Sequence, residues 1–127
     1  MFQGIEHTAI ASPDPERLAQ WYETHLDFAI NFRASGSRTT FVKAPDGSMI
    51  EIIESNAAPS HTPQMRAPGI RHMAIKVKEM AAAYGKLKAQ GVNFLSAPET
   101  TNGNTVAFFT DCDGNILHLL HREKPLP

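Results

Sequence analysis

The chain has 127 residues, the usual size of one domain, and can bury a core without disulfides or a structural metal. Its 12 basic and 13 acidic residues nearly cancel, so the composition gives no reason to expect a nucleic-acid partner or an acidic membrane surface. Its single cysteine excludes an internal disulfide, no apolar run is long enough to span a bilayer, and the first residues lack a signal-peptide pattern. We therefore expect one domain in the cytoplasm, with no membrane contact.

The first half of the chain, about residues 1–55, predicts one strand, one helix and three further strands. The segment Ser12-Pro13-Asp14-Pro15-Glu16 combines a candidate N-cap with prolines and acids that suit the first turn of a helix. Pro45-Asp46-Gly47 predicts the turn between the last two strands, because Asp-Gly tolerates positive φ. The strands are expected near residues 5–11, 28–33, 38–44 and 48–54.

The second half, about residues 70–122, predicts the same order of elements. A strand near 70–77 precedes a helix over Lys78 to Gln90, which Gly91 ends. Asp113-Gly114 again predicts a turn, and the last three strands are expected near 93–95, 104–110 and 115–121. Residues 56–69 contain three prolines and a glycine, which indicates a linker between two βαβββ modules.

Two sequence patterns recur in the same order in both halves. Residues 5–10 (IEHTAI) and 70–75 (IRHMAI) share the pattern I-x-H-x-A-I at an offset of 65. Residues 46–54 (DGSMIEIIE) and 113–121 (DGNILHLLH) share an Asp-Gly turn followed by an aliphatic strand at an offset of 67. Two ordered matches at nearly equal offsets indicate an internal duplication.

Two segments of the first module carry a resemblance to a known family. Residues 21–28 (WYETHLDF) resemble the motif F-Y-x-x-x-L-G-F, with Asp27 in place of the usual glycine, and residues 45–52 (PDGSMIEI) resemble D-P-D-G-x-x-I-E-L. Asp is among the few residues that tolerate a left-handed turn. Over essentially its whole length the chain resembles the vicinal-oxygen-chelate superfamily of glyoxalases, bleomycin resistance proteins and extradiol dioxygenases. The resemblance implies an α+β fold in which two tandem βαβββ modules form a cup-shaped mixed sheet around one metal.

The same resemblance implies four metal ligands: His7 and Glu51 from the first module, and His72 and His118 from the second. Glu51 shares a strand face with Ile53, so the carboxylate points toward an otherwise apolar face, where a cation would compensate its burial. A lone histidine on an apolar strand is usually a core residue, but four matched positions favour a site. Nitrogen and oxygen donors without sulfur suit one divalent zinc, nickel, iron, manganese or cobalt ion.

Five other candidate residues are left out of the expected site. Glu54 and His121 match across the repeat but fall on the opposite strand face, so we interpret them as outer-face residues. His25 and His61 have no counterpart in the other half. Cys112 lies in a predicted turn without a recognisable activating base, which favours a plain loop cysteine.

The resemblance implies a metal-dependent lyase, isomerase or epimerase that stabilises an enolate-type intermediate of a small oxygenated substrate, with Glu51 as catalytic base. His118 stands where many relatives have glutamate, which puts glyoxalase I activity in question. Two alternatives stay open: an iron(II)-dependent ring-cleaving dioxygenase and a non-catalytic protein that binds a drug-like small molecule. Relatives of this size imply a homodimer.

Several residues on or beside predicted strands could line the substrate site or simply serve packing and solvation. These are Phe32, Phe41, Phe94, Phe108 and either Arg33 or Arg38.

Overall fold

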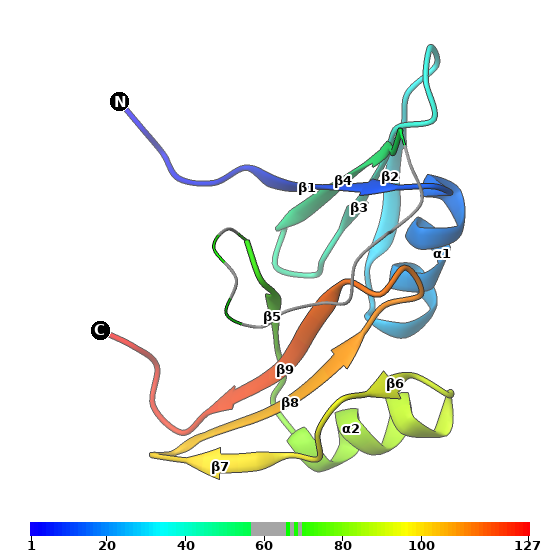
Figure 1. Ribbon diagram of the computed structural model, residues 1–127. Helices are drawn as coiled ribbons and strands as arrows, with labels where there is room; N and C mark the ends of the chain where they lie inside the picture. Colours follow the sequence, from blue (N-terminus) through cyan, green and yellow to red (C-terminus); the bar gives the residue numbers. More distant parts are fainter. Residues whose placement is uncertain (57–65, 67, 69) are drawn as a thin grey trace. The chain divides into compact units, whose positions relative to one another are not determined.

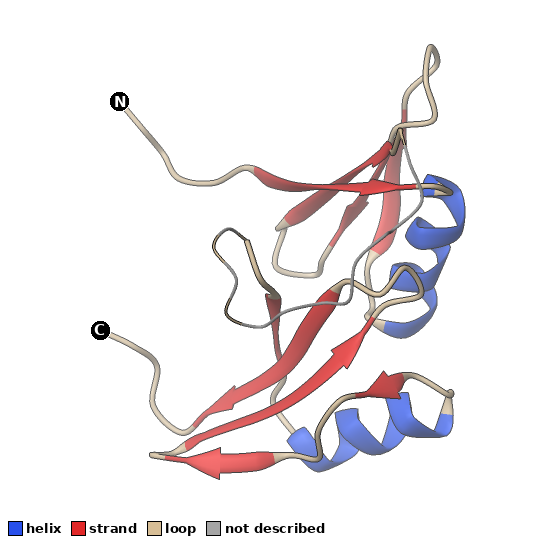
Figure 2. Ribbon diagram, in the orientation of Figure 1, coloured by secondary structure: helices blue, strands red, loops and turns tan. Residues whose placement is uncertain are grey.

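A computed structural model describes residues 1–56, 66, 68 and 70–127 (Figure 1). The chain divides into two compact units, Met1–Ser60 and His61–Pro127. Most of the expected linker, residues 57–65, 67 and 69, lies outside the described residues. Each unit contains one helix and one mixed sheet (Figure 2). The predicted α+β class with two βαβββ modules is therefore confirmed, apart from one additional short strand.

The first unit forms a four-stranded sheet with one helix against it. The strand order is β1-β4-β3-β2, in which β1 pairs with β4 in parallel and the other neighbours are antiparallel. Asp14 caps the helix by accepting a hydrogen bond from the Arg17 backbone N–H (3.2 Å), as the Ser-Pro-Asp-Pro segment predicted. The elements are β1 (His7–Ser12), α1 (Pro15–His25), β2 (Ala29–Arg33), β3 (Thr40–Lys43) and β4 (Met49–Glu54).

The second unit repeats this plan. The strand order is β5-β9-β8-β6, with β5 parallel to β9, and a further strand, β7, pairs with β8. The elements are β5 (Met73–Lys76), α2 (Met80–Ala89), β6 (Asn93–Phe94), β7 (Glu99–Thr101), β8 (Asn104–Thr110) and β9 (Ile116–Arg122). Neither helix of the described residues could cross a membrane, since α1 has 11 residues and α2 has 10.

Strand β7 is the element that the sequence did not predict. Strands β6 and β7 both pair with β8, so they act as one edge strand that is interrupted between Phe94 and Glu99. Pro98 falls in this interruption and has no N–H for a ladder hydrogen bond. Ser96 Oγ instead accepts a hydrogen bond from the Phe108 backbone N–H (3.0 Å), which holds the interrupted segment against β8.

The two predicted Asp-Gly turns have the same geometry. Gly47 has φ 94° and Gly114 has φ 86°, values that residues with a Cβ rarely adopt. In the first turn, Gly47 N–H donates to the Ala44 carbonyl (2.9 Å), and in the second Gly114 N–H donates to the Asp111 carbonyl (3.1 Å). Because a turn fixes the register of the strands that it joins, these turns set the same register in both units.

The core of each unit lies between its helix and one face of its sheet. In the first unit α1 packs across the strands, and in the second unit α2 packs on β9. The core residues of the first unit include Leu18, Tyr22, Val42, Ile50 and Ile52, and those of the second include Leu87, Ala107, Phe109, Leu117 and Leu119. Side chains alternate along a strand, so the residues between these core positions point to the face away from the helix. We call this second face the open face.

Candidate metal centre

The first pair of expected ligands comes together on the open face of the first unit. His7 begins β1 and Glu51 lies in the middle of the neighbouring strand β4. Glu51 alternates with Ile50 and Ile52, which face α1, so its carboxylate points away from the helix. His7 Nε2 lies 3.0 Å from Glu51 Oε2. The register places Ala9 beside Glu51, and this small side chain leaves the carboxylate accessible to His7.

Glu6 contacts the expected ligand His7, and the sequence repeat gave no indication of this contact. Its Oε2 forms a short hydrogen bond with His7 Nδ1. This hydrogen bond, supported by the negative charges of Glu6 and Glu51, raises the pKa of His7. With Nδ1 directed at Glu6, the imidazole presents Nε2 to Glu51, which is the orientation that a carboxylate typically gives to a ligating histidine.

The second pair comes together on the open face of the second unit. His72 directly precedes β5 and His118 lies in β9, and their ring centroids are 4.6 Å apart. Ala74 is the register partner of His118, as Ala9 is of Glu51, so the two units place their pairs on equivalent strands. Each unit therefore brings its two expected ligands side by side.

A backbone contact selects one tautomer of His118. Its Nδ1 lies 3.2 Å from the Leu119 carbonyl oxygen, which can only accept, so Nδ1 carries the proton and Nε2 keeps its lone pair. The side chain is buried, and this burial lowers the pKa of His118, with smaller contributions in the same direction from His72 and Arg122. A lowered pKa favours the neutral imidazole that binds metals.

An aromatic ring lies against each pair at equivalent positions. Phe41 is the register partner of Glu51 and makes an edge contact with His7, at a centroid distance of 5.5 Å. Phe108 is the register partner of His118 and contacts both His72 (5.8 Å) and His118 (4.9 Å). The offset of 67 that relates the two Asp-Gly turns also relates these phenylalanines, a match that the sequence contains but that our sequence analysis did not use.

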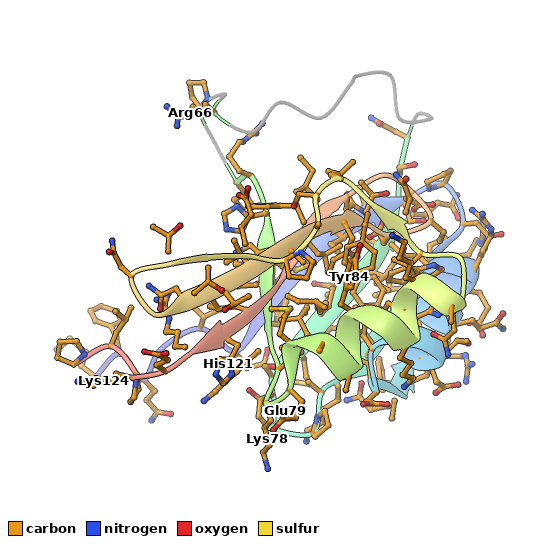
Figure 3. All side chains as sticks on the ribbon, turned by 90° about the horizontal axis from the view of Figure 1, so that it is seen from below. Arg66, Lys78, Glu79, Tyr84, His121 and Lys124 are labelled. Carbon is orange, nitrogen blue, oxygen red and sulfur yellow. The ribbon has the colours of Figure 1, made fainter. Side chains whose placement is uncertain are left out.

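The residues that we left out of the site lie elsewhere. Glu54 lies on the helix side of β4 and pairs with Arg38 (3.1 Å). His121 Nδ1 donates to the Val77 carbonyl (3.3 Å), close to the start of α2, where Figure 3 labels Lys78 and Glu79. His25 stacks on Trp21 at the end of α1, at a centroid distance of 4.8 Å.

Cys112 lies half-buried in the turn between β8 and β9. His61 falls outside the described residues.

The possible lining residues divide between the two sheet faces. Phe41 and Phe108 lie on the open faces, and so does Phe32, which contacts Phe41. Phe94 lies on the helix side, where it contacts Tyr84 (4.5 Å) and Phe109 (5.4 Å).

The two candidate arginines are both engaged in ion pairs. Arg33 forms a two-point ion pair with Glu16 of α1, at 2.7 and 3.0 Å, and Arg38 pairs with Asp14 and Glu54. These pairs direct both guanidinium groups toward the α1 side of the sheet.

The donor chemistry of the two pairs fits a divalent transition metal. Three imidazoles and one carboxylate supply nitrogen and oxygen donors, the set that zinc, iron, manganese, nickel and cobalt accept. Each unit, taken by itself, contributes two of these donors. Among residues 1–56, 66, 68 and 70–127, no group of three or more His, Cys, Asp or Glu side chains is gathered in a geometry that could hold a metal ion.

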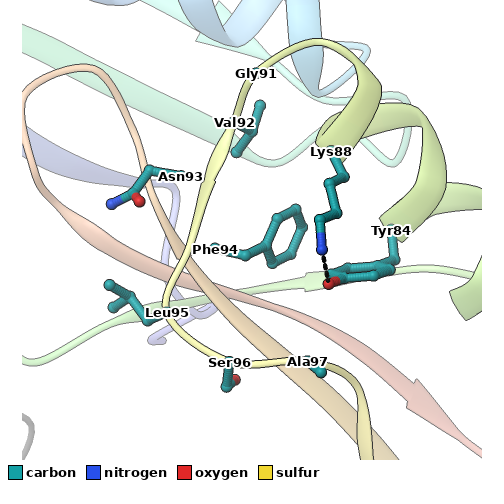
Figure 4. A pocket seen from close by; sticks show the side chains of 9 residues that line it. All are labelled: Tyr84, Lys88, Gly91, Val92, Asn93, Phe94, Leu95, Ser96 and Ala97. Atoms are coloured by element: carbon teal, nitrogen blue, oxygen red, sulfur yellow. Dashed lines mark hydrogen bonds between the residues drawn. The ribbon is translucent and has the colours of Figure 1, made fainter.

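The second unit also contains a groove of about 510 Å³ (Figure 4). It lies between the end of α2 and the segment 91–97, and Lys88 Nζ donates to Tyr84 Oη (3.1 Å) along its α2 wall. Phe94 points into the groove from the helix side of the sheet, and none of the four candidate ligands lines it. We therefore do not assign the groove to the metal centre.

Comparison with known proteins finds one family and many similar folds. The sequence profile of the Glyoxalase/Bleomycin resistance protein/Dioxygenase superfamily matches residues 4–119. An uncharacterized protein of Shewanella frigidimarina is 23% identical over 134 residues, which cover all of this chain and 99% of that protein.

Two solved structures illustrate the similarity of fold. A glyoxalase family protein from Enterococcus faecalis is 26% identical with a TM-score of 0.78, over 94% of this chain and 98% of that one. A glyoxylase/bleomycin resistance protein/dioxygenase domain from Frankia sp. EAN1pec is 21% identical with a TM-score of 0.78, over 97% of this chain and 100% of that one. The similarity to the Frankia domain concerns the fold alone.

Proposed function

The chain belongs to the glyoxalase/bleomycin resistance protein/dioxygenase superfamily, and from this membership we propose that it is a metal-dependent lyase, isomerase or epimerase. Members of the superfamily typically bind a metal and commonly act on small molecules as homodimers. The observation that carries the proposal is the shared register: each unit sets two metal-compatible donors side by side on equivalent strands.

We propose that His7, Glu51, His72 and His118 together hold one divalent ion, within one chain or between two copies. Two features of the free protein support this assignment. Glu6 accepts from Nδ1 of His7 and the Leu119 carbonyl accepts from Nδ1 of His118, so Nε2 is the nitrogen that each imidazole could offer to an ion. In the metal-free protein, Nε2 of His7 contacts Glu51 Oε2 instead (3.0 Å). When bound, a divalent ion supplies Lewis acidity toward a substrate oxyanion of enolate type.

Glu51 is the proposed proton carrier. Its Oε2 can accept a proton from a substrate carbon, since a carboxylate is an effective base when it is partly shielded from water. Many relatives have a second glutamate at the position of His118. In this chain Glu51 is the one carboxylate among the four proposed ligands, so it would carry proton transfer alone.

Metal content tests this proposal directly. Untagged protein and four single alanine variants, at His7, Glu51, His72 and His118, would be incubated with each candidate ion, dialysed and measured by elemental analysis. We expect about one ion per chain in the native protein and loss of this ion in each variant.

His121→Ala is the matched control, because this histidine shares β9 with His118 but points to the helix side. It should retain the ion. Absence of metal in the native protein after reconstitution would refute the enzyme proposal and leave a ligand-binding member of the family. Iron as the preferred ion would instead direct assays toward ring cleavage.

A further inference from the structure

Strand β2 carries a β-bulge that turns one aromatic side chain toward the open face. Ile30 pairs with Val42, which faces α1, whereas Phe32 pairs with Phe41, which faces away from α1. In a regular strand, residues 30 and 32 would share a face, so the register shift between them reverses the orientation of Phe32. Arg33 then returns to the helix side and pairs with Glu16. Bulges often re-aim a side chain beside a functional site.

The Phe32 side chain is exposed to solvent although its ring contacts Phe41. Its exposed fraction is 57%, although its ring forms an edge contact with Phe41 at a centroid distance of 5.9 Å. The core of the unit lies on the other face of the sheet and does not use this ring. A large apolar surface kept in water beside polar donors is a common mark of a binding site.

The register connects Phe32 to the proposed metal ligand. Phe32 is the partner of Phe41, Phe41 is the partner of Glu51, and Glu51 is the partner of Ala9. These four residues form one row across the sheet, in which neighbouring strands lie about 4.8 Å apart. A group bound on Phe32 and Phe41 is therefore about one to two strand spacings from the Glu51 backbone.

Charge on the same face discriminates among the groups that an aromatic ring can bind. An exposed phenylalanine face attracts either another apolar or aromatic group or a cation. Lys43 follows Phe41 by two residues on β3, so its side chain projects from the open face beside this row, whereas the Glu51 carboxylate lies on the other side of Phe41. With the proposed divalent ion held at Glu51, this carboxylate is neutralised, and the ion and Lys43 would together repel an organic cation there.

From this arrangement we infer that Phe32 and Phe41 form a subsite for an aryl substituent of the substrate. The inference rests on the proposed function, since it places the oxygen atoms of the same molecule toward His7 and Glu51. The substrate class is accordingly a small molecule with neighbouring oxygens and an aryl group. Phe32 acts as a specificity residue and takes no part in the chemistry.

Two inert hydroxy acids test the inference. Mandelate and lactate have the same vicinal oxygens and the same charge, and they differ by a phenyl group in place of a methyl group. Dissociation constants for both would be measured by NMR titration, with metal-free protein and with zinc-loaded protein. We expect mandelate to bind about fivefold more tightly than lactate, as one aromatic contact provides.

The variants identify the residue responsible. Phe32→Ala should remove most of the preference, since only Phe41 of the subsite remains, while Phe32→Leu should keep a larger part of it. Phe2→Ala is the control, because Phe2 is an exposed phenylalanine outside the row, with an exposed fraction of 96%. It should behave like the native protein. Circular dichroism should show the native fold in all three variants, since neither phenylalanine belongs to the core.

The outcomes separate this inference from the proposed function. One outcome would overturn the aryl subsite alone. In it, zinc binding depends on the four ligands, but the two acids bind with equal affinity or neither binds detectably. A mandelate preference that needs Phe32, in a protein that takes up none of the candidate ions, would support the subsite and refute the metal proposal. A Phe32→Ala variant that keeps the preference but dissociates a dimer would assign Phe32 to an interface and overturn the inference.

Discussion

The contact between Glu6 and His7 allows a sharp test of how the proposed metal ligands are oriented. Glu6 Oε2 accepts from Nδ1 of His7, and removing such an outer carboxylate typically weakens metal binding by about 10- to 100-fold. The Glu6 side chain is 68% exposed, so water screens the interaction and the lower end of this range applies. We therefore expect Glu6→Gln to weaken zinc affinity by about tenfold, close to 1.4 kcal/mol.

The assay must separate this effect from proton competition. Glu6 also raises the pKa of His7, so its removal makes the imidazole easier to deprotonate and would favour metal binding in acid. Competition with a chromophoric chelator at about pH 8.5, some two units above the ordinary imidazole pKa, largely removes this second effect. NMR titration of the His7 ring in the metal-free protein should show a lower pKa in Glu6→Gln than in the native protein.

A matched variant makes the result interpretable. Glu54→Gln removes a carboxylate of the same unit that pairs with Arg38 on the helix side, and we expect its zinc affinity to equal that of the native protein. Equal affinities in Glu6→Gln and the native protein would refute the reasoning that Glu6 orients a ligand. Equal losses in both variants would point to net charge as the cause.

Three further predictions concern catalysis, acid stability and backbone strain. Glu51→Gln should keep the native circular dichroism spectrum and lose metal-dependent proton transfer; a fully active variant would remove Glu51 as the base. Arg33 lowers the pKa of Glu16 below its ordinary value of 4.5. The ion pair therefore contributes its full stabilisation above about pH 4.5, and this contribution is lost as the pH falls through the lowered pKa of Glu16 in the folded protein. Urea titrations across this range should show a smaller loss of stability in Glu16→Gln than in the native protein. Asp27 has φ 58°, so Asp27→Gly should exceed Asp27→Ala in unfolding free energy by about 1 kcal/mol; equal stabilities would argue against strain at this position.

The duplication and the placement of the four candidate ligands follow from the sequence. The period of a strand is two residues, so the aliphatic pattern around Glu51 and His118 is enough to separate these side chains from their core neighbours. The Asp-Gly turns are local signals, since their positive φ values depend on the residues themselves. Equal offsets between the halves then predict equal register, and the strand pairing confirms it.

The tertiary structure decides what depends on pairing between distant residues. Alternation along β2 predicts that Ile30 and Phe32 lie on one face of the sheet, but the β-bulge between them places them on opposite faces. The position of the bulge depends on the register of β2 against β3, which the sequence of β2 alone does not determine. Phe94 is equally apolar in sequence, yet it packs under α2. The contact of Glu6 with His7 depends on side-chain conformation, which no periodicity encodes. Sequence periodicity therefore determines which residues can share a face, while the pairing of strands determines which of them meet at the site.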